Sequence, residues 1–163
     1  MFKVTHLAGV DPGIVHTGVV LLTIDKDQRC VVVDHEAVPG SDVTRVQQFL
    51  GGLRNTAHVF IEGYKPRSVY DTDARMAKAV NEIKAGLPTA TVLLNTGVKK
   101  VVKQPLMELL GCWKFSTPTH HQDLRSAARI ALLGALKQEH TNRLIADIVR
   151  DHLRGDDWNV TAA

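Results

Sequence analysis

Four side chains in this sequence have the types and positions needed to hold divalent cations. Asp11 and Glu62 each stand where an apolar run ends, and His120 and Asp123 stand three residues apart at the start of an Ala- and Leu-rich stretch. That spacing puts the last two on one face of a helix. Three carboxylates and an imidazole can hold a pair of cations about 4 Å apart, which activates a water molecule for attack on a phosphodiester.

These side chains converge only if the elements that carry them are neighbours. Runs rich in Val, Leu and Ile predict five strands, at residues 4–10, 18–24, 30–38, 57–61 and 89–94. The first three are separated by short turn signals and form an antiparallel meander, whereas a helical pattern between the last two predicts a parallel pair. The fold class is therefore α/β, with a five-stranded mixed sheet flanked by helices.

The position of the first strand decides whether the two strand-borne acids meet. If the first and fourth strands are parallel neighbours, their ends lie about 5 Å apart and Asp11 converges with Glu62. The boundary between an antiparallel meander and parallel crossovers is also the kind of switch point at which ligands bind.

Apolar residues recur at helical spacing in the remaining stretches of the chain. They predict a helix capped by Ser41 over residues 41–53, a second over 70–87, a weak helix over 98–110, and helices over 120–136 and 144–153. We expect residues 1–154 to form a single domain and residues 155–163 to form a loose tail.

Composition narrows the class of protein without identifying it. The 163 residues are 44% hydrophobic, which suits one compact domain, and the net charge of +3 leans only mildly toward an anionic partner. The first five residues do not resemble a signal segment, no run approaches about 18 apolar residues, and there are two cysteines. We expect a cytoplasmic protein.

Each of the four candidate ligands has a structural alternative. Asp11 before Pro-Gly is typical of a turn former, and Glu62 at the end of an apolar strand needs partners of some kind. Asp123 at a helix start interacts favourably with the helix dipole, and His120 suits a cap or a surface position. The order and placement of all four together favour the metal site.

Three motifs resemble the RuvC-type Holliday-junction resolvases, which have the RNase H-like nuclease fold: GVDPGIVHTG, FIEGY, and HHQD followed by Ser126, Ala127 and Ala128. The resemblance spans residues 4–136. It implies that Asp11, Glu62, His120 and Asp123 are catalytic metal ligands for two Mg²⁺ or Mn²⁺ ions.

The same resemblance implies an activity and partners. The expected reaction is hydrolytic nicking of four-way DNA junctions, and of other branched DNA such as flaps and forks, to leave 5′-phosphate ends. A homodimer with one active site per subunit is implied as well, in a bacterial cell or a phage-infected host.

Two alignments of the third motif remain open. The first takes His120 and Asp123 as ligands, and many family members carry Asp at the position of His120. The second pairs Asp123 with Ser126 and leaves the site one strong ligand short. We prefer the first, because Asp123 then directly precedes the helix body. Imidazole ligation predicts that Mn²⁺ is a good cofactor.

Candidate DNA contacts come from two segments. One combines basic residues with tyrosine, and the other contains three closely spaced lysines. The candidates are Tyr64, Lys65 and Arg67 in GYKPRSVY, and Lys99, Lys100 and Lys103 in VKKVVKQ. An aromatic ring can stack on an unpaired base, and lysines bind phosphates. Solvated surface segments are the alternative for both.

Two other functions are compatible with parts of the pattern. A DNA-junction binder without catalysis would keep the fold and the basic residues, although clustered acids repel DNA unless a metal ion is present. The turn DPGIVHTG also resembles the phosphate-binding turn of actin-like and sugar-kinase ATPases. Those need two such domains, and this chain has no second turn of that type.

Overall fold

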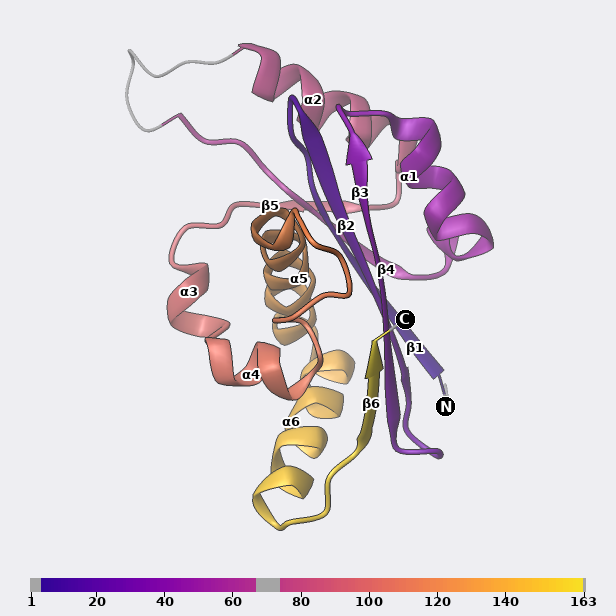
Figure 1. Cartoon of the computed structure of the whole chain (residues 1–163), viewed down its shortest axis with the longest axis vertical. Coiled ribbons are helices and arrows are strands. Elements are labelled where there is room, and N and C mark those ends of the chain that lie inside the picture. Colours follow the sequence, from indigo (N-terminus) through magenta and orange to yellow (C-terminus); the bar gives the residue numbers. More distant parts are fainter. Residues whose placement is uncertain (1–3, 67–73, 163) are drawn as a thin grey trace.

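A six-stranded mixed sheet forms the centre of the molecule in the computed structural model, which describes residues 4–66 and 74–162 (Figure 1). The strand order is β5-β4-β1-β2-β3-β6. The strands are β1 (Val4–Asp11), β2 (His16–Asp25), β3 (Cys30–Pro39), β4 (His58–Glu62), β5 (Thr91–Leu93) and β6 (Asn159–Ala162).

The expected strand directions are confirmed. β1, β2 and β3 form an antiparallel meander, and β4 pairs with β1 in parallel and with β5 in parallel. Val10 lies opposite Ile61 in this register. The residues that follow them, Asp11 and Glu62, therefore end neighbouring strands at the same end of the sheet. β1 thus lies at the boundary between the antiparallel and parallel halves of the sheet.

Helices cover both faces of the sheet (Figure 1). They are α1 (Val43–Leu50), a 3₁₀ turn (Gly51–Asn55), α2 (Ala74–Gly86), α3 (Val98–Val101), α4 (Gln104–Leu109), α5 (His121–Leu136) and α6 (Glu139–Leu153). Among the described segments, no helix is long and apolar enough to span a bilayer.

Alternation along the central strands divides the core into two layers. Leu7 and Val20 face α5 and α6 in one apolar cluster, whereas Ala8 and Val19 face α1 and α2 in the other. Successive residues of β1 and β2 are therefore buried alternately against the two helical layers. Both faces of these strands are covered, which explains why their sequences are continuous apolar runs.

The structure differs from the sequence expectations at several element boundaries. Asp42, not Ser41, caps α1, because its carboxylate accepts a hydrogen bond of 3.3 Å from the backbone N–H of Arg45. The stretch 98–110 forms two short helices, because Val102 leaves helical geometry with φ −100° and ψ 89°. The last helix starts at Glu139 rather than near residue 144.

The largest difference lies at the C-terminal end, where residues 155–163 were expected to be loose. Asn159–Ala162 instead forms β6, which pairs in parallel with β3 and raises the strand count from five to six. Trp158 is buried and donates a hydrogen bond of 2.8 Å to Asp151 of α6. This anchor holds the segment beside the sheet edge.

Candidate active site

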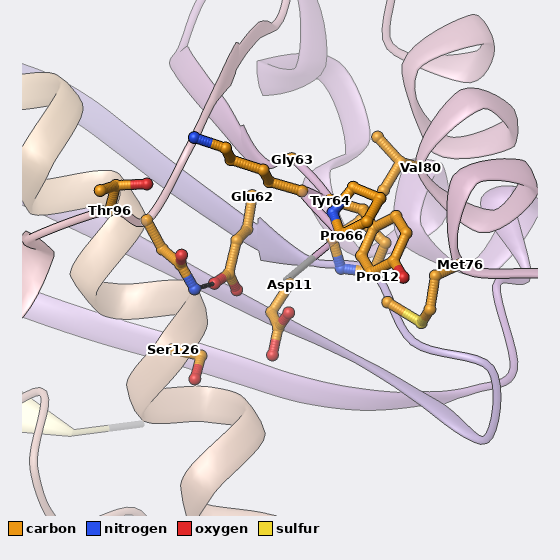
Figure 2. A pocket seen from close by; sticks show the side chains of 12 residues that line it. Asp11, Pro12, Glu62, Gly63, Tyr64, Pro66, Met76, Val80, Thr96 and Ser126 are labelled. Atoms are coloured by element: carbon orange, nitrogen blue, oxygen red, sulfur yellow. Dashed lines mark hydrogen bonds between the residues drawn. The ribbon is translucent and has the colours of Figure 1, made fainter. Parts of the chain in front are cut away.

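A cleft of about 620 Å³ opens where β1 and β4 end (Figure 2). Asp11 and Glu62 line it from the ends of the two strands, and Ser126 lines it from α5. Other residues that line it are Pro12, Gly63, Tyr64, Lys65, Pro66, Met76, Val80, Asn95 and Thr96. The cleft therefore lies at the switch point predicted from the strand order.

Two glycines bring α5 close enough to present its polar residues to the strand-borne acids. A Cβ atom on Gly9 would lie 1.8 Å from the backbone oxygen of Ala127, and one on Gly18 would lie 2.5 Å from that of Asp123. Gly18 is also the antiparallel partner of Asp11. Only glycine permits this approach, which places Asp123 and Ser126 beside the end of β1.

The Asp11 carboxyl group is strongly perturbed by this environment. Burial is the largest cause, and hydrogen bonding with Glu62 and the negative charges of Glu62 and Asp123 add to it, so that the pKa of Asp11 is raised from 3.8 to about 9. Every one of these contributions disfavours the carboxylate. Asp11 is therefore protonated at neutral pH unless a cation approaches it.

Glu62 is held by an amide from the loop after β5. The side-chain N–H of Asn95 donates a hydrogen bond to the Glu62 carboxylate, and this contact is drawn in Figure 2. A donor of this kind fixes the orientation of the carboxylate. Asn95 is a site residue that the sequence did not reveal, because it belongs to an ordinary polar loop.

His120 lies outside the cleft lining. It is the N-cap residue of α5 with a positive φ of 66°, and its ring lies 4.1 Å from the ring of His16, centroid to centroid. Its Nδ1 atom is 3.5 Å from Oδ2 of Asp123. The imidazole thus contacts the helix-borne acid rather than Asp11 or Glu62 directly.

The four predicted ligands form a connected series rather than one cluster. Glu62 contacts Asp11, the charge of Asp123 acts on Asp11, and Asp123 contacts His120. Within residues 4–66 and 74–162, no three His, Cys, Asp or Glu side chains are gathered to hold one metal ion.

The donor chemistry nevertheless fits hard divalent cations. The half-buried carboxyl groups of Asp11 and Glu62 offer oxygen ligands, which Mg²⁺ and Mn²⁺ prefer, and the Ser126 hydroxyl lines the same cleft. Because burial and neighbouring acids raise the pKa of Asp11, a cation bound beside it would stabilise its carboxylate form.

The predicted DNA contacts occupy different places. Tyr64 and Lys65 line the cleft, and Lys99 lines a smaller recess of about 50 Å³ beside it. Lys100 on α3 and Lys103 at the start of α4 are exposed and belong to neither lining. Arg67 lies outside the described residues.

The smaller recess also contains a residue that sequence reasoning missed. Arg129 lines it together with Glu62, Asn95, Lys99 and Ser126. The available signal was its position three residues after Ser126, which places both on one face of α5.

The fold is shared with solved structures, although no protein-family model and no curated protein sequence matches the chain. Thermus thermophilus RuvC has a TM-score of 0.55 and 17% identity, with 78% of this chain and 92% of that chain covered. T. thermophilus RuvC in complex with its Holliday junction substrate has a TM-score of 0.52 and 18% identity, with 78% and 90% covered. The Fowlpox virus resolvase, solved with Holliday junction DNA, has a TM-score of 0.48 and 14% identity over 86% and 99%. The two RuvC comparisons show that the chain has the RNase H-like fold of the RuvC-type Holliday-junction resolvases.

Proposed function

We propose that this protein is a metal-dependent, structure-selective endodeoxyribonuclease that resolves Holliday junctions and related branched DNA. The observation that carries the proposal is the hydrogen-bonded pair of Asp11 and Glu62 at the switch point of a RuvC-type fold, with Asp123 close enough on α5 for its charge to act on Asp11. The junction bound to the similar T. thermophilus RuvC supports four-way DNA as the substrate class.

Asp11, Glu62, Asp123 and His120 are the proposed ligands of two Mg²⁺ or Mn²⁺ ions. When bound, the ions activate a water molecule and neutralise the charge that develops on the phosphate and on the leaving oxygen. Asp11 stands in the middle of the ligand series, because both Glu62 and Asp123 act on it. Loss of its proton is the event that prepares the site.

Other side chains of the cleft position the substrate. Asn95 orients Glu62 through its hydrogen bond, and the Ser126 hydroxyl can donate to a phosphate oxygen. Tyr64 offers an aromatic face to an unpaired base, and Lys65 offers a charge to the backbone. Hydrolysis between the phosphorus and the 3′ oxygen would leave the phosphate on the 5′ end.

A junction-binding protein without catalysis is the second candidate. It is favoured by Ser126, which occupies the cleft face of α5 with a hydroxyl instead of a carboxylate, and by the absence of a three-ligand cluster among the described residues. Both candidates use the same DNA surface, so they differ only in hydrolysis.

Cleavage of end-labelled four-way junction, flap and linear duplex DNA in Mg²⁺ and in Mn²⁺ separates them. We expect cutting of branched DNA that disappears in Asp11→Asn, with 5′-phosphate ends that a ligase can rejoin. Binding without cutting in either metal would favour the second candidate. Equal cutting by Asp11→Asn would point to a contaminating nuclease and remove the proposed site.

We also propose a homodimer, because resolving a junction requires coordinated cuts in two strands. Ala74, Ala77 and Lys78 form an exposed face of α2 on which two copies could pack. Sedimentation at micromolar concentration, alone and with junction DNA, tests this. A monomer under both conditions would remove the dimer and the coordinated cutting.

A further inference from the structure

Two arginines of α5 contact the ring of Trp113, and one of them, Arg129, lines the smaller recess. The guanidinium carbon of Arg125 lies 3.9 Å from the ring centroid, and that of Arg129 lies 5.6 Å from it. Nε of Arg125 also donates a hydrogen bond of 2.8 Å to the backbone oxygen of Trp113. The tryptophan therefore holds both side chains in defined positions on the surface of the helix.

Arg129 differs from Arg125 at its Nε atom, which lacks a hydrogen-bond partner among the described residues. This Nε atom is buried, so water does not take the place of the missing acceptor. Glu62 lines the same recess, but its hydrogen bond comes from Asn95. A buried donor without an acceptor costs about 1–3 kcal/mol in general, so its retention calls for an explanation.

The two guanidinium groups also repel each other. Burial and the charge of Arg125 lower the pKa of Arg129 from its ordinary value. A bound anion relieves both penalties, since it accepts hydrogen bonds from Arg129 and neutralises the pair. Lys99, which lines the same recess, adds a third positive charge.

The position of this recess indicates which anion it would bind. The recess shares Glu62, Asn95 and Ser126 with the cleft. An anion bound in the recess would therefore lie next to a phosphate bound in the cleft. Its volume of about 50 Å³ suits a phosphate group and excludes a nucleoside. Each DNA strand carries one phosphate per nucleotide, so the phosphate next to one bound in the cleft is the natural occupant of the recess.

We propose that Arg129, held against Trp113 with Arg125 and assisted by Lys99, binds the backbone phosphate next to the one that is cleaved. This site rests on the proposed function and adds a DNA contact on the α3 side of the cleft. Arg129 thereby sets the path of the cleaved strand across Asp11 and Glu62.

The test is the salt dependence of DNA binding, measured without hydrolysis. Fluorescence anisotropy with a labelled four-way junction, in EDTA and in Ca²⁺ at several salt concentrations, gives the slope of log affinity against log salt for each variant. Arg129→Gln is expected to weaken binding several-fold at low salt and to reduce the slope by about 0.9, the value for one phosphate contact.

Arg129→Lys and Arg143→Gln are the matched controls. Arg129→Lys keeps the charge and is expected to retain the wild-type slope. Arg143 is exposed on α6 and pairs only with Glu139 among described residues, so its loss makes the same charge change far from the cleft and is expected to leave the slope unchanged.

Several outcomes would overturn the inference. One is a folded Arg129→Gln with wild-type affinity and slope, and another is an Arg143→Gln with an equal effect, which would indicate a general charge effect. If Arg129→Gln does not fold, Arg129→Met preserves the stem against Trp113. Failure of both neutral variants while Arg129→Lys folds would assign Arg129 to stability alone.

The same data keep this inference separate from the nuclease proposal. A reduced slope in Arg129→Gln supports the phosphate site even if the wild-type protein cuts no DNA. Cutting by the wild type with an unchanged slope in Arg129→Gln overturns the phosphate site alone. A wild-type protein that binds no DNA overturns both.

Discussion

Asp11 and Glu62 stand side by side at the ends of the parallel strands β1 and β4, where burial and the Glu62 carboxyl group together raise the pKa of Asp11. Such a pair opposes its own ionisation, and the third acid, Asp123, adds to the repulsion. Keeping these three acids together at the end of β1 therefore lowers the stability of the fold, as is common at functional sites.

The first prediction is that Asp11→Asn stabilises the fold in EDTA. The folded pKa is about 9 and the ordinary value is 3.8, so the native state binds more protons than the unfolded state between these pH values. The free energy of unfolding of the wild type consequently falls as pH rises through this window. At pH 8 we expect Asp11→Asn to be more stable by about 2 kcal/mol, measured by urea unfolding.

The control for this prediction is pH itself. Near pH 4 both forms carry a neutral side chain at position 11, so their stabilities should approach each other. Adding Mn²⁺ at pH 8 should stabilise the wild type more than Asp11→Asn, since only the wild type offers the carboxylate. A mutant that is less stable than the wild type at pH 8 in EDTA would show that Asp11 is a structural turn former.

The second prediction concerns the approach of α5 to the sheet. Gly18→Ala places a Cβ atom 2.5 Å from the backbone oxygen of Asp123, so the helix must move away from β2. We expect a loss of about 1–3 kcal/mol of stability, as for other overpacked contacts, and a fall in cleavage rate of tenfold or more. Thermal unfolding and single-turnover cleavage measure the two effects.

Gly52→Ala is the matched control, since a Cβ atom at Gly52 meets nothing within 4 Å. It makes the same chemical change in the 3₁₀ turn after α1, and it should leave cleavage unchanged. Full activity of Gly18→Ala would show that the distance between α5 and β2 does not govern the site.

The central elements were predictable because their signals are local. Continuous apolar runs and short turns specify β1 to β4, and Asp11 and Glu62 follow from where those runs end. β6 was not predictable, because four residues carry little strand signal and their pairing depends on Trp158 and Asp151, which come together only in the folded chain.

The helix-borne part of the site was harder to predict, for a similar reason. The motif placed His120 and Asp123 on one face, and the structure brings them to 3.5 Å. Which face of α5 enters the cleft depends on the crossing at Gly9 and Gly18, and glycines give no local signal of such an approach. The sequence therefore offered Ser126 as an alternative site residue, but it did not show that Ser126 lines the cleft.

The third prediction distinguishes the two alignments of this motif. Ser126→Asp adds a carboxylate beside Asp11 and Glu62, so it should tighten Mg²⁺ or Mn²⁺ binding by tenfold or more and lower stability in EDTA. Calorimetric titration of metal into each variant gives the affinities. Unchanged metal affinity would mean that position 126 does not reach the ions.

His120→Ala completes that comparison. If the imidazole is a ligand, the variant should lose affinity for Mn²⁺ more than for Mg²⁺, because nitrogen donors suit Mn²⁺ better. His121→Ala is an adequate control, as His121 is the neighbouring histidine and bonds the backbone oxygen of Thr117. Equal loss of both metals in His120→Ala would indicate that the ring acts only by holding Asp123.

The fourth prediction separates recognition of branched DNA from general DNA affinity. Tyr64 and Lys65 are adjacent in the cleft lining, but a ring binds an unpaired base whereas an ammonium group binds any backbone phosphate. Tyr64→Ala should therefore weaken four-way junction binding by about tenfold and leave linear duplex binding nearly unchanged, a loss within the range for one stacked base. Lys65→Gln should weaken binding of both DNAs alike and reduce the salt slope of each by about 0.9, the value for one phosphate contact.

Tyr64 also packs against the apolar cluster under α1 and α2, so Tyr64→Phe is needed to show that the ring, and not the fold, is responsible. If Tyr64→Ala lowers the affinity for junction and duplex by the same factor while Tyr64→Phe behaves as wild type, the ring supports the cleft but does not select branched DNA.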